Sequence, residues 1–329
     1  MCIVKNNHKK PFINHKPRFF VQKYQPHYQG QRYLGNVQNQ LTTTYQRLSS
    51  GMRINSAKDD AAGLQIADRL TSQINGLNQG NRNASDGIAL AQTMEAGMDE
   101  ISGMLQKIRT LAVQAANGTN TAEDKTALSK EATSLANEIS RIALQTTYAG
   151  KTILRGQKDD ESTIFSKAAN NTDNGKAGKL TLQVGSNKGD TISFSVESMQ
   201  FSKIGSRADP KFKDNFVDKN VIKVTASVIS IDFTVKSAAD ITIGLMDSMI
   251  ANVDAQRADL GALQNRLESS IRNQSNVAAN EADARSRIRD ADFAEESANL
   301  SQQSIIQQAA ASMLMQANTR PQLGLSLLG

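Results

Sequence analysis

The sequence of 329 residues predicts a mainly α-helical fold. Segments from the two ends of the chain are expected to pair as a long antiparallel helical rod or coiled coil, with a small insert rich in β-hairpins. Apolar residues recur at spacings of three and four near both ends, as in amphipathic helices. The spacing changes to alternation only between about residues 150 and 236. The chain has no Trp and only 5% aromatic residues, and small aliphatic side chains suit helices packed on helices.

Residues 1–30 differ in composition from the rest of the chain. They contain all three histidines, three of the five prolines and the single cysteine, and they lack helical periodicity. This composition predicts a disordered basic tail. Two interpretations remain open, a genuine terminal variation or a shift of the reading frame upstream of about residue 31, and the abrupt change in composition favours the shift.

The net charge of +6 belongs to one end of the chain. Residues 1–58 contain ten basic and no acidic residues, which leaves 28 basic residues to balance 32 acidic ones elsewhere. A nucleic-acid-binding function would therefore rest on the tail alone. A single cysteine excludes an intrachain disulfide. We expect neither a signal peptide nor a membrane span, because no apolar run of the required kind occurs.

The next zone, from 31 to about 149, predicts helices. Leu34, Leu41 and Leu48 recur at intervals of seven, and apolar residues then follow at threes and fours for several turns. A break near residue 118 ends this long helix. Thr121 and Asp124 have the spacing of a capping box, which predicts a shorter second helix.

The middle of the chain predicts strands. Apolar residues alternate on both sides of a glycine-bearing loop at 185–189, the pattern of a β-hairpin. Residues 221–235 are rich in Val, Ile and Thr and predict one or two further strands.

From about residue 238 the pattern is helical again, and Pro321 is expected to end the last helix. One apolar stripe on this part should face a stripe on the first long helix. The first stripe comprises Leu260, Leu263, Leu267 and Ile271, and the second Ile101, Leu105 and Ile108.

The apolar stripes nearest the two termini are hard to cover within one chain, which predicts burial between subunits. The residues expected at this interface are Leu34, Leu41, Leu48, Ile305, Ile306, Met313, Leu314, Leu325, Leu327 and Leu328.

No residue pattern supports catalysis. Every histidine lies in the tail, and no phosphate-binding glycine motif occurs. Asp59 and Asp60 are interpreted as the start of a helix, where negative charge is favourable. The acidic cluster Asp290, Asp292, Glu295 and Glu296 lacks the glycine turn of a calcium loop. We therefore expect a protein that is not an enzyme and has no cofactor and no metal site.

Two long segments carry a resemblance to a known family. LSSGMRINSAKDDAAGLQIADRL at 48–70 resembles the N-terminal signature of bacterial flagellins. DAQRADLGALQNRLESSI at 254–271 and SRIRDADFAEESANLSQQSIIQQAAASMLMQAN at 286–318 resemble their C-terminal signature. The resemblance covers about 31–205 and 236–329.

The resemblance implies a division of the chain. Residues 31–56 with 285–329 would form the terminal helical core for filament assembly. Residues 57–205 with 236–284 would form a helical rod with its β-hairpin, and 206–235 a short variable central segment. The implied function is a structural subunit of the flagellar filament, secreted to the extracellular flagellum, exported unfolded and self-assembling through its terminal helices for motility.

The implied partners are other copies of the chain, a flagellar export chaperone, the flagellar type III export apparatus, the filament cap and the hook-associated proteins. Two alternatives stand beside this interpretation. One is the hook–filament junction protein, which shares the terminal signatures more weakly. The other, of a different class, is a nucleic-acid-binding protein that uses the basic tail.

The resemblance also implies a possible surface for the vertebrate innate immune receptor of flagellin. The matching positions are Lys107, Leu111 and Glu131. Lys107 stands where such flagellins usually have Arg, and lysine lacks the bidentate geometry of a guanidinium group. We expect receptor activity that is weakened by this difference.

Overall fold

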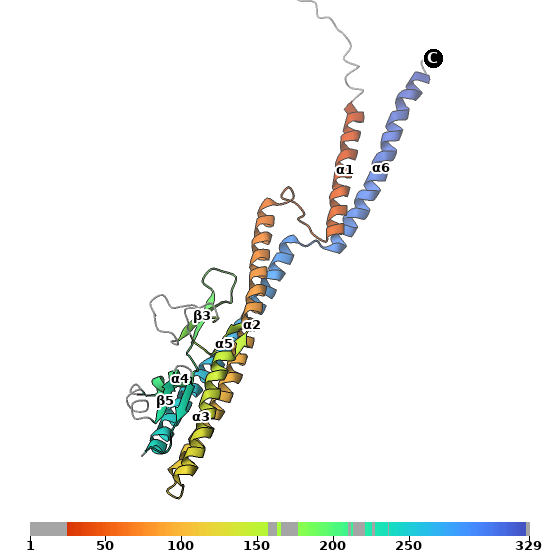
Figure 1. The fold of residues 1–329 in the computed structure, drawn as a ribbon. Coiled ribbons are helices and arrows are strands. Elements are labelled where there is room, and N and C mark those ends of the chain that lie inside the picture. Colours follow the sequence, from red (N-terminus) through yellow and green to blue (C-terminus); the bar gives the residue numbers. More distant parts are fainter. Residues whose placement is uncertain are drawn as a thin grey trace, which may run out of the picture. The chain divides into compact units, whose positions relative to one another are not determined.

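The computed structural model describes residues 25–156, 163–165, 177–209, 212, 221–225, 228–235 and 237–326. Figure 1 shows that helices dominate, as predicted. The helices are α1 (Gln25–Ser50), α2 (Ala61–Ala116), α3 (Ala122–Gln145), α4 (Phe201–Ala208), α5 (Ala238–Arg289) and α6 (Phe293–Ser326). The strands are β1 (Thr147–Tyr148), β2 (Lys151–Thr152), β3 (Gly178–Gln183), β4 (Thr191–Val196), β5 (Ile222–Thr225) and β6 (Val228–Ile231).

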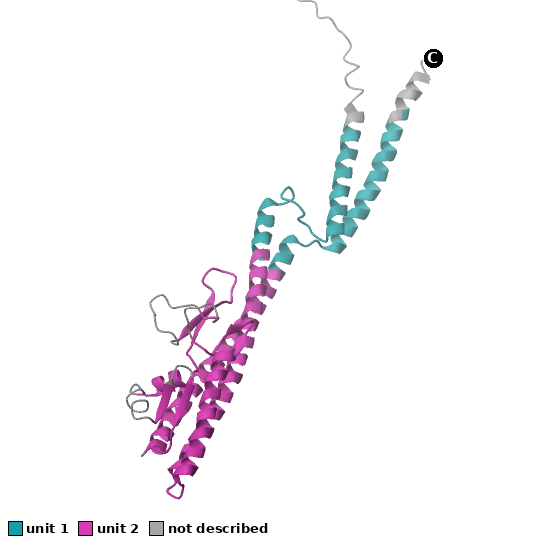
Figure 2. Ribbon diagram, in the orientation of Figure 1, with its two compact units in different colours: residues 1–70, 283–329 teal, residues 71–282 magenta. Residues whose placement is uncertain are grey.

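The chain forms two compact units, coloured separately in Figure 2. Unit 1 comprises residues 1–70 and 283–329, and unit 2 comprises residues 71–282. In unit 1, α1 and α6 lie side by side (Figure 1), so the expected pairing of the two chain ends is confirmed there.

Two predictions about the helix ends in unit 1 were wrong. Helix α1 begins at Gln25, inside the segment that composition predicted to be disordered, while residues 1–24 lie outside the described part. The part of α1 before residue 31 has a packing partner, because Gly30 lies against Leu314 of α6. Helix α6 continues past Pro321 to Ser326. A proline inside a helix lacks an N–H donor and its ring meets the carbonyl four residues earlier, which kinks a helix or breaks it, and here the helix continues.

Local signals in the sequence did predict where α2 and α3 begin. Asp60 Oδ1 accepts a hydrogen bond from the Gly63 amide, 2.9 Å away, at the start of α2. The capping box of α3 is formed as predicted, with Thr121 and Asp124 bonding each other reciprocally. The bonds from Thr121 hold the pKa of the Asp124 carboxyl below its usual value. The contribution of this cap is therefore present above the unfolded pKa and is lost as the pH falls through the folded pKa.

The core of unit 2 is built from α2, α3 and α5. Two ion pairs show how α5 is aligned with α2, since Asp247 pairs with Arg109 and Arg257 pairs with Asp99. The stripe at 260–271 was predicted to face the stripe at 101–108, and this alignment was wrong by several helical turns along the axis. Leu267 meets α2 at Gly87, and the stretch of α2 at 101–108 lies opposite an earlier part of α5. Periodicity gives the face of a helix but not its axial alignment with a partner.

The predicted β-hairpin is formed by β3 and β4, with Leu182 opposite Ile192. It packs against α2 at positions without side chains. A Cβ added to Gly80 would lie 2.1 Å from the carbonyl oxygen of Val184, and one added to Gly76 would lie 2.7 Å from Ser186 Cβ. The glycines of α2 thus allow the hairpin to approach the helix backbone directly.

The predicted strands within 221–235 are present as the antiparallel pair β5–β6. The outer edge of β6 is bonded to side chains of α3. Asn137 donates to the Ile229 carbonyl at 2.9 Å and accepts from the Ile229 amide at 2.8 Å. Thr133 Oγ1 accepts from the Ile231 amide at 2.9 Å, and Ser129 Oγ accepts from the Phe233 amide at 2.9 Å.

This side-chain ladder satisfies backbone groups that would otherwise need a third strand. Ser129, Thr133 and Asn137 are four residues apart and so share one helix face. The backbone groups that they bind belong to alternate residues of the strand segment, which point to the same side. The side chains of Ile229, Ile231 and Phe233 are buried at the same time. The central segment is therefore fastened to α3 and forms part of the core of unit 2.

Replacing Asn137 by alanine should loosen the β5–β6 pair. The change leaves the buried amide and carbonyl of Ile229 unsatisfied, which costs about 1–3 kcal/mol for each group. Hydrogen exchange at the Ile229 amide should accelerate accordingly. Asn252→Ala is the matched control, because Asn252 Nδ2 bonds only the Ser248 carbonyl of its own helix. Equal protection of Ile229 in both variants would contradict the ladder.

Candidate assembly surface

The predicted interface residues on α1 and α6 fall into two groups. Those in the first group are half-buried, namely Leu34, Leu41, Leu48, Ile306 and Leu314. The second group is exposed, with Ile305 at 67% and Met313 at 68%. The side chain of Leu325, and Leu327 and Leu328 entirely, lie outside the described residues. Pairing of α1 with α6 thus covers only part of the predicted surface.

The sequence analysis missed two residues in the seam between these helices. Val37 and Thr44 are each 4% exposed and lie between the predicted leucines. Thr44 Oγ1 donates to Gln303 Oε1 across the seam at 3.0 Å. The spacing 34, 37, 41, 44, 48 is a heptad pattern, so the missed signal was the alternation of threes and fours.

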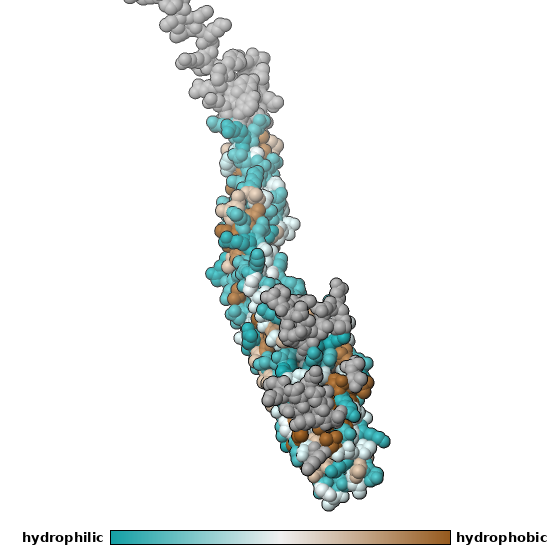
Figure 3. Space-filling view, turned by 60° about the vertical axis from the view of Figure 1, so that its left-hand side comes forward, coloured by the Kyte–Doolittle hydropathy of each residue, from teal (hydrophilic) through white to brown (hydrophobic). Residues whose placement is uncertain are grey.

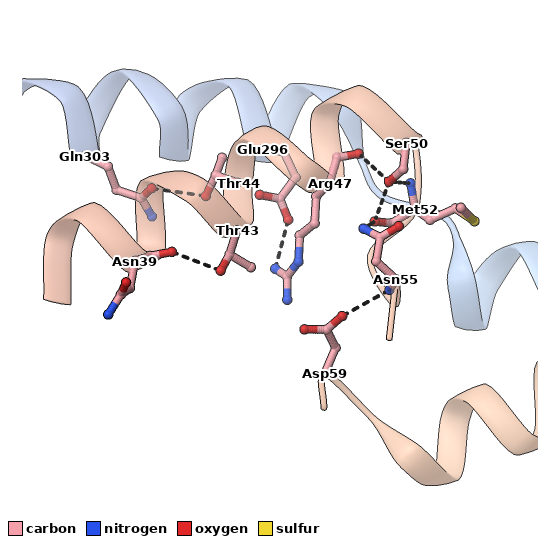
Figure 4. Close-up of polar contacts among 10 residues, drawn as sticks. All are labelled: Asn39, Thr43, Thr44, Arg47, Ser50, Met52, Asn55, Asp59, Glu296 and Gln303. Atoms are coloured by element: carbon pink, nitrogen blue, oxygen red, sulfur yellow. Dashed lines mark hydrogen bonds and ion pairs between the residues drawn. The ribbon is translucent and has the colours of Figure 1, made fainter. Parts of the chain in front are cut away.

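One ion pair joins the two helices near the connector (Figure 4). Arg47 Nη1 lies 3.0 Å from Glu296 Oε1. Glu296 is only 7% exposed. A carboxylate so far removed from water needs a partner, and Arg47 supplies it. The pair fixes the position of α6 along α1.

Replacing Arg47 by methionine should destabilise the α1–α6 pair. The variant keeps an apolar stem but leaves the buried Glu296 carboxylate without its cation. This loss should lower the stability of the helix pair by about 1–3 kcal/mol. Amide exchange of α1 at neutral pH would report the loss. The double variant Arg47→Met with Glu296→Gln removes both charges and should recover most of the protection. A double variant weaker than the single one would show that the pair does not act in this way.

The two connectors of unit 1 are bonded to each other. Residues 51–60 join α1 to α2, and residues 290–292 join α5 to α6. Arg53 donates its amide to the Arg289 carbonyl at 2.7 Å, and Ala291 donates to the Gly51 carbonyl at 3.0 Å. Gly51 has φ +68°, which favours glycine at this turn. Asp59 accepts from two backbone amides, and those bonds lower its pKa.

The acidic cluster noted in the sequence divides into separate structural roles. Asp292 Oδ1 accepts from the Ala294 amide at 2.9 Å and so caps the start of α6. Asp290 accepts from Ser286 Oγ, and Glu296 pairs with Arg47. Among the described residues, no group of three or more metal-binding side chains gathers in one place.

An apolar groove of about 560 Å³ lies between α1 and α6. Its lining contains no charged side chain. The lining residues are Gly30, Tyr33, Ile306, Ala309, Ala310, Met313, Leu314 and Ala317.

The surface of the α1–α6 pair is also unusually poor in charge. Residues 33–46 of α1 and 297–319 of α6 contain no Asp, Glu, Lys or Arg. Large apolar side chains are exposed on the same stretches, and Figure 3 shows apolar residues at the surface among hydrophilic ones. These exposed residues are Tyr33, Tyr45, Ile305, Met313 and Met315. Depletion of charge with enrichment of Tyr and Met is typical of the buried centre of a protein interface.

The three residues of the second predicted surface lie on α2 and α3 in unit 2. Lys107 and Glu131 are exposed, and Leu111 is half-buried against the core. The short loop between Ala116 and Ala122 turns the chain back, and Lys107 and Glu131 are at similar sequence distances from it. This places the three residues at a similar level of the helix hairpin.

The bacterial flagellin N-terminal helical region matches residues 21–159, and the bacterial flagellin C-terminal helical region matches residues 243–328. Flagellin A of Vibrio cholerae serotype O1 is 35% identical, over 91% of this chain and 96% of its own length. Polar flagellin C of Vibrio parahaemolyticus is 33% identical over the same shares of both chains.

One solved structure has a similar fold. A putative flagellar hook-associated protein from Vibrio parahaemolyticus covers 70% of this chain and 100% of its own, with a TM-score of 0.52 and 16% identity. That likeness concerns the fold alone. Bacillus cereus flagellin covers 60% of this chain and 94% of its own, with a TM-score of 0.41 and 27% identity. Within the described residues, no helix has the length and apolar character needed to cross a bilayer.

Proposed function

Because the chain belongs to the bacterial flagellin family, we propose that the α1–α6 pair is the surface through which its copies assemble into the flagellar filament. The protein is a structural subunit of that filament and serves motility. Its relatives do not favour the hook–filament junction protein or a nucleic-acid-binding protein. We assign it a structural role and no catalytic one.

One observation is the main support for assembly through the α1–α6 pair. The paired stretches of α1 and α6 expose large apolar side chains and have no charged residues. Isolated helices that face water normally carry charge on their outer side. An uncharged outer side with exposed Ile305 and Met313 would gain free energy from burial, at about 25 cal/mol per Å² of apolar surface.

Assembly explains which predicted residues the pair leaves uncovered. Half-buried Leu41 and Leu314 would hold α1 and α6 together, while exposed Ile305 and Met313 would contact neighbouring subunits. The same apolar residues need cover before assembly. We therefore propose an export chaperone for this end of the chain, unfolded passage through the flagellar type III export apparatus, and contact with the cap and hook-associated proteins.

Substituting Ile305 by aspartate should abolish filament formation without unfolding the monomer. The side chain is 67% exposed, so the free subunit tolerates a carboxylate, whereas a subunit interface would bury it without a partner. Electron microscopy and sedimentation of the secreted protein would measure assembly. Val228→Asp in β6, where the valine is 60% exposed, is the matched control and should assemble. Normal filaments from Ile305→Asp would refute the assigned surface.

We also propose that the innate immune receptor surface includes Lys107, Leu111 and Glu131. The exposure of the two charged side chains supports this assignment, and partly covered Leu111 would add an apolar contact. Lys107→Arg should strengthen receptor activation by the soluble chain, because arginine restores bidentate bonding. A reporter-cell assay that shows no gain would argue against a direct contact at this position.

A further inference from the structure

Most methionines among the described residues are either fully buried or largely exposed. Five of them are fully buried in unit 2, each with 0% exposure: Met94, Met98, Met199, Met246 and Met249. Two in α6 are exposed, Met313 at 68% and Met315 at 65%. Met52 and Met104 are half-buried. The two most accessible thioethers among the described residues therefore lie together on the helix proposed for assembly.

An exposed thioether reacts with a hydroperoxide. The sulfur attacks one peroxide oxygen, the O–O bond breaks and an S–O bond forms, so that the sulfur loses two electrons. The second oxygen takes up a proton and leaves as water from hydrogen peroxide, or as an alcohol from an alkyl hydroperoxide. The reaction requires contact between sulfur and oxidant. Buried Met94 or Met249 meets the oxidant only when unit 2 opens, whereas Met313 and Met315 meet it in the folded chain.

The product changes the surface on which it forms. A sulfoxide turns a flexible apolar side chain into a polar one. Met313 lines the apolar groove beside Ile306 and Leu314. Met315 follows two residues later, which turns it by about 200° to the opposite side of the helix. Oxidation of both would place polar groups on two sides of a helix stretch that has no charged residue.

We propose that Met313 and Met315 are sulfoxidation sites for hydroperoxides and that their oxidation blocks incorporation of the subunit into the filament. This proposal rests on the assembly surface assigned above. It makes assembly, and not the fold of unit 2, the step that peroxide inhibits. The oxidised subunit remains folded because both side chains project into water.

Selective oxidation of Met313 and Met315 is tested by treating the folded soluble chain with hydrogen peroxide and measuring each methionine by peptide mass spectrometry. Met313 and Met315 should be oxidised at least about tenfold faster than Met94 and Met249, because reactivity follows exposure. Oxidation at equal rates in all four would overturn the proposal. Circular dichroism of the treated chain should be unchanged, and an unfolded product would overturn the claim that the block is local.

Assembly assays test whether this oxidation blocks incorporation of the subunit into the filament. The oxidised chain should fail to polymerise. For the double variant Met313→Leu with Met315→Leu, polymerisation is compared with and without peroxide, and the treatment should cause no further loss. Met313→Gln with Met315→Gln imitates the polar product and should fail without peroxide. Full assembly of the oxidised natural chain, or equal sensitivity in the leucine variant, would overturn the proposal. Failure of the untreated chain to polymerise would instead contradict the assembly function itself.

Discussion

Replacing Leu267 by aspartate is expected to unfold most of unit 2 at moderate temperature. Leu267 is completely buried and covers Gly87 of α2 together with Leu182 of the β3–β4 hairpin. Truncating a buried leucine lowers the free energy of unfolding by about 2–5 kcal/mol. The carboxylate adds the penalty of an unpaired buried charge, about 3–5 kcal/mol where a buried pair is broken. Domains of this kind are stable by only about 5–15 kcal/mol.

Thermal unfolding of the monomer, followed by circular dichroism at neutral pH, would measure this loss. Asn265→Asp introduces the same charge two residues away at an exposed position and serves as the control. The control should melt close to the natural chain, and Leu267→Asp far below it. Similar melting of both variants would mean that Leu267 does not lie in the core.

The second large effect is expected at Gly80, where alanine should destabilise the protein although alanine favours helices. The new Cβ would lie 2.1 Å from the Val184 carbonyl oxygen and 2.8 Å from its carbon. These are backbone atoms, so no side-chain rotation relieves the clash, and the hairpin must shift away from α2. Such overpacking costs about 1–3 kcal/mol. It outweighs the gain of about 1 kcal/mol that alanine brings to a helix.

Gly103 in the same helix provides a matched control. A Cβ added there meets nothing within 4 Å. Gly103→Ala should therefore raise the melting temperature, while Gly80→Ala should lower it and make the hairpin more sensitive to protease. The opposite signs test the close approach directly, since both variants make the same substitution in the same helix. A rise in both melting temperatures would exclude the contact with Val184.

Features encoded by neighbouring residues could be predicted from the sequence. The capping box at Thr121, the alternation in β3 and β4, and the heptad of Leu34, Leu41 and Leu48 each depend on short spacings. The segments that resemble the family signatures lie mainly in α2, α5 and α6. Local spacing is sufficient here because helix faces and strand faces repeat at fixed periods.

Features that depend on distant partners could not be predicted. The alignment of α5 with α2 is seen in pairs such as Asp247 with Arg109, which lie 138 residues apart. The burial of Glu296 depends on Arg47, from the other end of the chain. Pro321 was expected to end α6, because proline either kinks or breaks a helix, and the local sequence does not decide between these two results. Such outcomes are decided by tertiary packing.

The ladder between α3 and β6 has a consequence for how the gene can diverge. Ser129, Thr133 and Asn137 bind amide and carbonyl groups of the strand segment, which every residue type except proline provides in full. Recognition of the segment therefore does not require particular side chains at its outward positions, such as Val228. Substitutions can accumulate there without loss of docking as long as the three side chains on α3 persist. The exposed side chains of the strand segment can therefore change, while the three side chains of α3 keep the segment in the same position.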